Sequence, residues 1–278
     1  MGNEPLFEVA AELIAQADSL IVSAGAGIGV DSGLPDFRGT TGFWSAYPSL
    51  AQDKVDFFRI ACPDAFRSQP LRAWGFYGHR LNLYRTTTPH EGFQILKRWG
   101  ESMPRGYAVF TSNVDGQFQK AGFDPATVHE CHGSIHHLQC LEPCCSDIWS
   151  ADGFNPEVDW ENCRLLNVPP KCPRCKGLAR PNILMFSDGE WLTQRQDDQA
   201  GRFAAWLSRV ERPVVVEVGA GTSIPSVRRL SHQILQGFNG RLVRINPREF
   251  AVPTSMDVGL ACDAGYALAA IDKLVSKG

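Results

Sequence analysis

The stretch Ser19-Leu-Ile-Val-Ser-Ala-Gly-Ala-Gly-Ile-Gly29 decides the fold, because a short, mostly apolar run leads directly into a glycine-rich turn. Such runs, bounded by turn residues, are typical of strands that are buried on both faces of a parallel sheet. Glycines directly after a strand let the backbone approach a pyrophosphate closely. Glycine turns are also common where no nucleotide binds. The stretch therefore predicts a buried strand and leaves a nucleotide site as a hypothesis.

Similar apolar runs recur later in the chain, with helix-length segments between them, at residues 107–111, 213–218 and 241–245. This alternation predicts an α/β fold, a doubly wound, Rossmann-like and mostly parallel sheet. Ahead of the first strand, Leu6, Val9, Leu13 and Ile14 follow near-helical spacing. We expect an amphipathic helix there, with these four side chains on its apolar face.

Two segments interrupt the α/β rhythm. Residues 43–89 are aromatic and helical in pattern, whereas residues 135–179 are rich in Cys, Pro, Asn and Asp and have little periodicity. A segment of the second kind has too few apolar residues for a core of its own, and a metal is the usual remedy. We expect a Rossmann-like domain from residues 1–42, 90–134 and 180–278, a helical insertion at 43–89, and a zinc-binding module at 135–179.

The chain has nine cysteines, and two of them form Cys172-Pro-Arg-Cys175. With Cys140 and Cys144 they would supply four thiolates, which suit a closed, structural Zn²⁺ site. Cys145 is an alternative fourth ligand, and free cysteines in a core are the alternative to any metal. The odd count and the close pair indicate metal thiolates in a reducing compartment rather than disulfides.

Charge and hydropathy exclude other classes of protein. The net charge is −3 over 278 residues without a basic cluster, which argues against nucleic-acid binding. The sequence contains no run of 18 apolar residues, the length that a membrane span needs. The first twenty residues lack the pattern of a secretory signal. We expect a cytoplasmic protein without a membrane partner; the sequence does not predict its oligomeric state.

The continuation of the glycine turn, GAGIGVDSGLPDFRG at residues 25–39, resembles the signature of the sirtuins. Further segments resemble sirtuin motifs in the family's order, namely Thr111-Ser-Asn-Val-Asp115, Cys131-His-Gly-Ser134, Gly221-Thr-Ser223, Arg244-Ile-Asn-Pro247 and Cys262-Asp-Ala264. The resemblance implies an NAD-dependent protein-lysine deacylase that acts on an acylated lysine of a protein. Such an enzyme releases nicotinamide and O-acyl-ADP-ribose.

The resemblance also implies roles for individual residues. His132 matches the general base, and Asn113 and Asp115 match the pair that orients the ribose and the carboxamide of NAD. The expected contacts to NAD come from Gly25, Ala26, Gly27, Asp36, Phe37, Arg38, Ser112, Asn113, Asp115, Gly221, Thr222, Ser223, Asn246, Cys262, Asp263 and Ala264. His129 is the alternative base, and without a catalytic role His132 would be a structural loop histidine and Asp115 a helix cap.

Tyr77 and Arg80 lie three residues apart in a predicted helix and would therefore share one face. Their Phe-Tyr-Gly-His-Arg context resembles that of sirtuins that prefer succinyl- or malonyl-lysine, in which the guanidinium clamps the acyl carboxylate. The alternative is a core tyrosine beside a solvated arginine. Phe186, Gly189 and Glu190 correspond to the segment that receives the substrate backbone.

The chain departs from the sirtuin pattern at three places. Gly29 stands where a serine is usual, Ser112 replaces a glutamine, and residues 185–191 read Met-Phe-Ser-Asp-Gly-Glu-Trp where the family has Phe-Phe-Gly-Glu. The last two changes motivate a rival function, an ADP-ribosyltransferase or NAD glycohydrolase on the same scaffold. A non-catalytic NAD-sensing module is the third alternative, and the presence of His132 argues against it.

Overall fold

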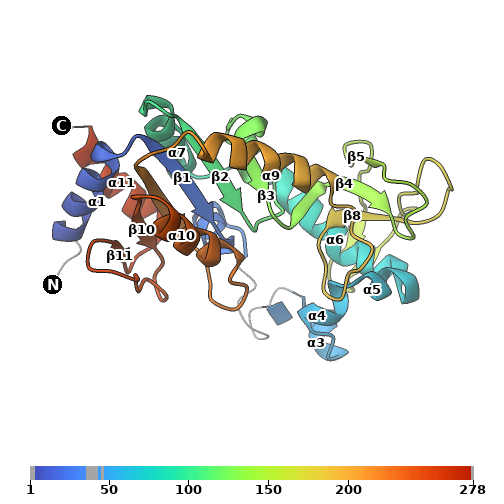
Figure 1. The fold of residues 1–278 in the computed structure, drawn as a ribbon. Helices are drawn as coiled ribbons and strands as arrows, with labels where there is room; N and C mark the ends of the chain where they lie inside the picture. The colour runs from blue at the N-terminus through green and yellow to red at the C-terminus, as the bar shows by residue number, and fades with distance from the viewer. Residues whose placement is uncertain (1–3, 36–42, 45–46, 277–278) are drawn as a thin grey trace.

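The computed structural model describes residues 4–35, 43–44 and 47–276 (Figure 1). Its larger part is built on a six-stranded sheet in the order β11-β10-β9-β1-β2-β3, in which every pair of neighbours is parallel. The strands are β1 (Ser19–Ala24), β2 (Tyr107–Thr111), β3 (Val128–Glu130), β9 (Pro213–Val218), β10 (Arg241–Ile245) and β11 (Val258–Leu260). The predicted doubly wound α/β fold is confirmed.

Helices cover both faces of this sheet. Successive side chains of a strand point to opposite faces, so each strand contributes to two cores. Leu20 and Val22 of β1 face one core, and Ile21 between them faces another. The first core is closed by α1 (Glu4–Gln16), α7 (Glu91–Ser102) and α11 (Ala264–Val275), and the second by α9 (Gln194–Leu207) and α10 (Ser226–Gly237).

The first helix forms where the spacing predicts it, but its buried face is shifted. Phe7, Ala10, Ala11 and Ile14 are buried, while Leu6 and Val9 are 40% and 43% exposed. The reason is that α1 packs on α11, and the small side chains of Ala10 and Ala11 let the two helices approach closely. The predicted apolar face was therefore wrong for Leu6 and Val9.

The smaller part combines the two insertions with a few flanking residues, since its longest strand begins at Gly133 and its last strand ends at Ile183. An antiparallel sheet in the order β5-β4-β8 carries the cysteine-rich loops, and a two-stranded ribbon, β6-β7, lies beside it. Its elements are α3 (Pro48–Gln52), α4 (Phe57–Ile60), α5 (Pro63–Ser68), α6 (Pro70–Thr86), β4 (Gly133–Cys140), β5 (Ile148–Ser150), β6 (Val158–Asp159), β7 (Arg164–Leu165) and β8 (Ala179–Ile183). Figure 1 shows these helices and strands gathered at one end of the molecule.

The two insertions share one hydrophobic core. Phe66 and Trp74 from the helices pack in the same cluster as Leu138, Phe154 and Leu165 from the cysteine-rich segment. The apolar side chains of the cysteine-rich segment therefore pack against those of the helical insertion, which explains how the segment is packed despite its polar composition.

Gly75 marks the closest approach of these two parts. A Cβ atom on Gly75 would lie 2.4 Å from the backbone of Cys163, so any side chain there would push α6 away.

Across the described part of the chain, no helix combines the length and apolar character that a membrane span needs.

Candidate functional site

The glycine turn after β1 packs directly on the turn after β9. A Cβ atom on Gly25 would lie 2.8 Å from the Cα of Ala220, and one on Gly219, whose φ is +64°, would lie 2.4 Å from the Cα of Gly27. The Gly27 N–H donates to the Gly219 carbonyl over 3.1 Å. This glycine cradle, formed by the two packed turns, lies at the carboxyl ends of two neighbouring strands, which is where parallel sheets bind nucleotides. Ala26 follows Gly25 in this turn and is the first residue of the short 3-10 helix η1 (Ala26–Ser32).

Asn113 connects the loop after β2 to this cradle. Its side-chain Nδ2 donates to the carbonyl of Gly25 over 3.1 Å, and its backbone N–H donates to the Thr111 hydroxyl over 3.0 Å. The predicted ribose-orienting residue is thereby held against the predicted phosphate turn.

Asp115 is buried, with 9% of its surface exposed. Burial raises the pKa of its carboxyl to about 6, although the Gln117 N–H donates to Oδ1 over 2.9 Å and opposes that rise. This hydrogen bond lies just ahead of the following helix, α8 (Gln117–Lys120), whose N-cap residue is Gly116 rather than Asp115. The alternative that Asp115 is itself a helix cap was therefore wrong, and its second carboxylate oxygen is left for another contact.

His132 follows β3 and is partly buried beside the same loops. Its Nε2 lies 3.2 Å from the Ser226 hydroxyl at the start of α10, and its backbone carbonyl accepts the Leu184 N–H over 3.0 Å. Burial lowers the pKa of the imidazole, and a hydrogen bond to the Ser112 backbone opposes that change. The ring is therefore neutral near pH 7 and able to accept a proton.

His129, the alternative base, has a structural environment instead. It is 6% exposed and packs edge-on against Phe110, with Phe203 of α9 nearby. Its Nε2 lies 2.9 Å from the Gln196 amide, and burial lowers its pKa to about 4. These contacts place the His129 ring in the core on the α9 side of the sheet, held by partners that His132 does not share.

The predicted adenosine-side residues lie on three loops. Asn246 is buried; its Nδ2 donates to the Ala220 carbonyl and its Oδ1 accepts two backbone N–H groups, so it fixes the Gly221–Ser223 turn from behind. Thr222 of that turn is tied to Glu249 through its N–H and its hydroxyl. Cys262 and Asp263 precede α11, whose first residue is Ala264. Asp36, Phe37 and Arg38 lie outside the described residues.

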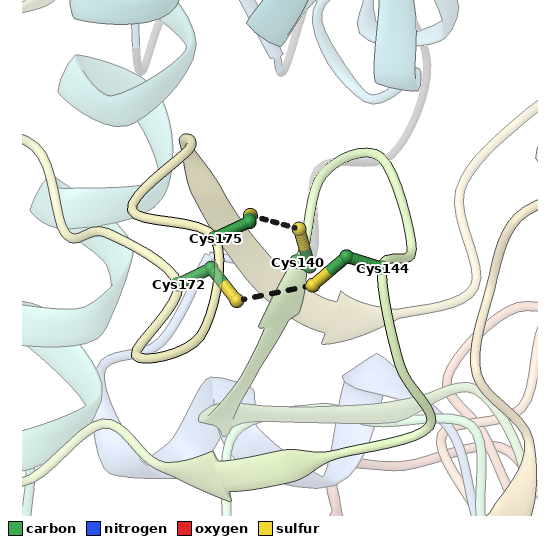
Figure 2. A group of neighbouring side chains, drawn as sticks. All are labelled: Cys140, Cys144, Cys172 and Cys175. Carbon is green, nitrogen blue, oxygen red and sulfur yellow. Dashed lines mark hydrogen bonds between the residues drawn. The ribbon is translucent and has the colours of Figure 1, made fainter.

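The four predicted metal cysteines meet at one point (Figure 2). Their Sγ atoms all lie within 4.8 Å of one another, and the Cys140–Cys175 and Cys144–Cys172 pairs are 3.5 and 3.6 Å apart. A tetrahedral Zn²⁺ site with bonds of ~2.3 Å has sulfur–sulfur edges of about 3.8 Å, so the geometry fits zinc. Cys145, whose Sγ is 3.9 Å from that of Cys144, is outside this group of four.

Tyr77 and Arg80 both lie on the buried side of α6. Tyr77 is 2% exposed and stacks on Phe66, while Arg80 is 9% exposed and donates through Nε and Nη2 to the hydroxyl of Tyr84. The Arg80 guanidinium also lies over the rings of Phe76 and Tyr84. The alternative interpretation expected a solvated arginine, whereas Arg80 is a buried cation among aromatic rings.

The predicted peptide-contacting residues occupy the loop after β8. Phe186 contacts the rings of Phe57 and Phe58, and its N–H donates to the carbonyl of Ala61 over 2.9 Å. Gly189 has no atom within 4 Å of the position a Cβ would take, so one side of the loop is open. The Glu190 carboxylate pairs with Arg67 of α5.

A cavity of about 900 Å³ lies between α9, β4 and the end of α6. Among the described residues, Asp115 is the only predicted NAD contact in its wall. Its basic side chains have structural partners, since Lys120 donates to the Arg85 and Thr87 carbonyls and Arg195 pairs with Glu130. The described wall of this cavity contains neither the glycine turns nor His132.

Comparisons with known proteins show the family to which the chain belongs. The profile of the Sir2 family matches residues 25–222. The NAD-dependent protein deacylase of Aquifex aeolicus is 31% identical over 86% of this chain and 88% of its own length. NAD-dependent protein deacylase 2 of Pyrobaculum aerophilum is 31% identical over 93% of this chain and 91% of its own length. The crystal structure of a Sir2 homologue–NAD complex superposes with a TM-score of 0.71 and is 25% identical, covering 96% of this chain and 93% of the other. The chain belongs to the Sir2 family, and the resemblance is confirmed.

Ser226 was not predicted as a site residue. It lies 94 positions after His132 and is adjacent to it only because α10 begins beside the loop after β3. The sequence carries no periodic signal for such a contact, although its place three residues after Gly221-Thr-Ser223 puts it near a recognised motif.

Proposed function

We propose that this protein is an NAD-dependent protein-lysine deacylase. The observation that carries the proposal is the convergence of four strand ends, those of β1, β9, β2 and β3, where the glycine cradle, Asn113 and the neutral imidazole of His132 meet. Relatives that match most of the chain bear the name NAD-dependent protein deacylase. The substrate would be an acylated lysine of a protein, and the thiol-rich metal site favours a reducing compartment such as the cytoplasm.

Each residue has a defined task in this proposal. Bound NAD would supply an electrophilic ribose carbon and a leaving nicotinamide. Gly25 and Gly219 would let the two turns pack closely beside the pyrophosphate, and Asn113 would keep the ribose in register with the Gly25 turn. His132 would hold the proton taken from a ribose hydroxyl on Nε2, the nitrogen that faces the Ser226 hydroxyl in the absence of ligand.

The proposal is tested by incubating the protein with NAD and peptides that carry acetyl-, succinyl- or longer acyl-lysine, and identifying products by mass. We expect one nicotinamide for each lysine deacylated. Nicotinamide without deacylated peptide would instead support the NAD glycohydrolase, and ADP-ribose attached to a protein would support the transferase.

The pH dependence of deacylation should show an acidic limb near pH 6. Both His132, with its lowered pKa, and Asp115, with a pKa of about 6, would act in their deprotonated forms. The value of kcat/KM should therefore be constant above about pH 7 and fall as the pH drops through about 6, where Asp115 takes up a proton. An acidic limb centred at pH 7.5 or higher would contradict this assignment.

Tyr77 and Arg80 predict a preference for acidic acyl groups. A neutral acyl chain offers the buried guanidinium no charged partner. The carboxylate of an acidic acyl chain would accept a charged hydrogen bond, which contributes about 1.5–3 kcal/mol to binding. Succinyl- or malonyl-lysine should thus exceed acetyl-lysine in kcat/KM by roughly 10- to 150-fold. Competition assays with paired peptides measure this ratio.

The Arg80→Met variant should remove the preference while it preserves most of the side-chain volume. The exposed Arg229 serves as the control, and Arg229→Met should leave the ratio unchanged. Equal or better wild-type activity on acetyl-lysine, or an unchanged ratio in Arg80→Met, would show that the pair is structural.

A further inference from the structure

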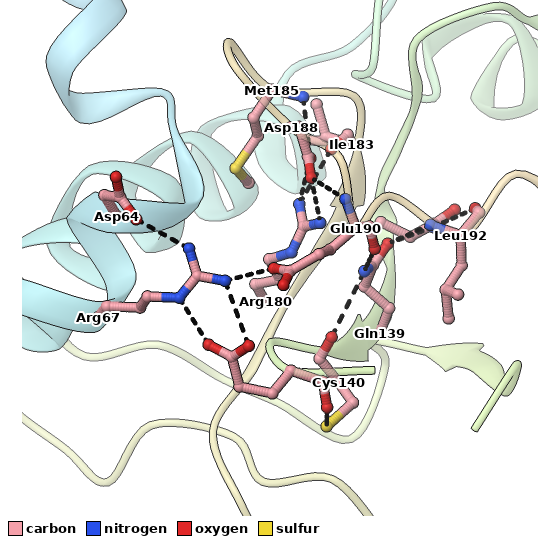
Figure 3. A network of polar contacts seen from close by, with 12 residues as sticks. Asp64, Arg67, Gln139, Cys140, Arg180, Ile183, Met185, Asp188, Glu190 and Leu192 are labelled. Atoms are coloured by element: carbon pink, nitrogen blue, oxygen red, sulfur yellow. Dashed lines mark hydrogen bonds and ion pairs between the residues drawn. The ribbon is translucent and has the colours of Figure 1, made fainter. Parts of the chain in front are cut away.

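The loop between β8 and α9 is held by a buried ion pair (Figure 3). Arg180 of β8 donates through Nη1 and Nη2 to the two carboxylate oxygens of Asp188, over 2.7 and 2.9 Å. Both side chains are 0% exposed. A bidentate guanidinium–carboxylate contact fixes angle as well as distance, so Asp188 has one orientation in the core.

The same carboxylate holds the loop backbone. Asp188 accepts the N–H of Met185 over 3.3 Å and the N–H of Glu190 over 3.1 Å. Ser187 between them is left-handed, at φ = +53°, a conformation that a non-glycine residue rarely adopts without such support. Asp188 therefore sets the path of the chain on both sides of itself.

Gln139 of β4 fixes the end of the loop. Its Nε2 donates to the Glu190 carbonyl over 2.9 Å, and its Oε1 accepts the Leu192 N–H over 3.0 Å. At the other end, the Leu184 N–H donates to the carbonyl of His132 over 3.0 Å. The loop is thus fastened to the backbone of the proposed base while its side at Gly189 stays open.

We propose that Asp188 is a positioning residue for the substrate peptide. With the ion pair to Arg180 and the hydrogen bonds from the Met185 and Glu190 N–H groups, it holds residues 185–190 in one preformed path, which the peptide that carries the acyl-lysine contacts. A preformed loop binds more tightly because less loop entropy is lost on binding. This inference rests on the proposed function. It also gives the local departure from the sirtuin pattern, Phe186-Ser-Asp-Gly-Glu190, a purpose in this chain.

The test is the Asp188→Asn variant, assayed by steady-state kinetics in which peptide and NAD are varied separately. We expect the KM for the acyl peptide to rise about tenfold, the effect of roughly one lost hydrogen bond. The value of kcat should stay within about threefold and the KM for NAD within about twofold, because the NAD cradle is elsewhere. A merely structural role would reduce the folded fraction, and therefore kcat, without changing the peptide KM.

Two comparisons complete the experiment. The double variant Arg180→Met/Asp188→Leu removes both charges, which cores often tolerate, and leaves the Met185 and Glu190 N–H groups without their acceptor. It should show the same rise in peptide KM even if Asp188→Asn fails to fold. Glu91→Gln, which breaks the exposed pair of Glu91 with Arg98, should change neither KM.

The outcomes separate this inference from the proposed function. A wild-type protein that deacylates no peptide contradicts the proposed function. A wild-type protein that does so, with a normal peptide KM in the folded double variant, contradicts only the role of Asp188. A parallel rise in the KM for NAD would also overturn that role.

Discussion

The His132→Ala variant is expected to lose deacylation by roughly 10²- to 10⁴-fold, the usual cost of removing a general base. NAD binding should be nearly unchanged, because the cradle at Gly25 and Gly219 and the contact from Asn113 do not depend on the imidazole. Single-turnover deacylation and NAD titration by calorimetry measure the two effects separately.

The matched control is His232→Ala, which removes an exposed imidazole of α10 and should leave turnover at the wild-type level. A His132→Ala variant with near wild-type turnover would mean that the base lies elsewhere. His129 would be the first residue to test, although its packing against Phe110 makes that outcome unexpected.

Removal of the metal should have the largest effect on the fold. We expect freshly purified protein to contain about one equivalent of zinc, and Cys172→Ser or a strong chelator to abolish deacylation and unfold the smaller part. Structural zinc sites contribute about 10–16 kcal/mol, comparable with the whole stability of a domain, ~5–15 kcal/mol. Metal analysis and circular dichroism follow the two losses.

Cys145→Ser is the control for the ligand assignment. Because Cys145 stands beside the group of four without belonging to it, this variant should keep its zinc. Less than about half an equivalent in the wild type, with the four thiols titrating as free, would contradict a zinc site. Zinc lost from Cys145→Ser but kept in Cys144→Ser would exchange the two assignments.

The long, apolar strands could be predicted from the sequence because burial on both faces leaves a continuous hydrophobic run. β1, β2, β9 and β10 begin and end at the expected residues. β3 and β11 have three residues each, too few for a recognisable run, and they form because their neighbours in the sheet offer hydrogen-bond partners. The face of α1 depended on α11, a helix more than 250 residues away.

The site divides in a similar way. The four cysteines were predicted as a set because thiolate ligands require that residue type, and the structure brings their sulfurs together. Ser226 and Asp188 could not be predicted, since serine and aspartate are common and their roles arise only from proximity to His132 and Arg180. Tertiary contacts of this kind carry no periodicity in the chain.

The shared core of the two insertions has a consequence for synthesis on the ribosome. Phe66 and Trp74 emerge early, yet they pack against Leu138, Phe154 and Leu165, which emerge some 60 to 100 residues later. Until then the aromatic side chains of the nascent helical segment have only one another to pack against, and the surface that Leu138, Phe154 and Leu165 will cover stays open. Its assembly therefore waits on a long-range contact, which makes this end of the molecule the slower to form and the more exposed to aggregation before the cysteine-rich segment arrives.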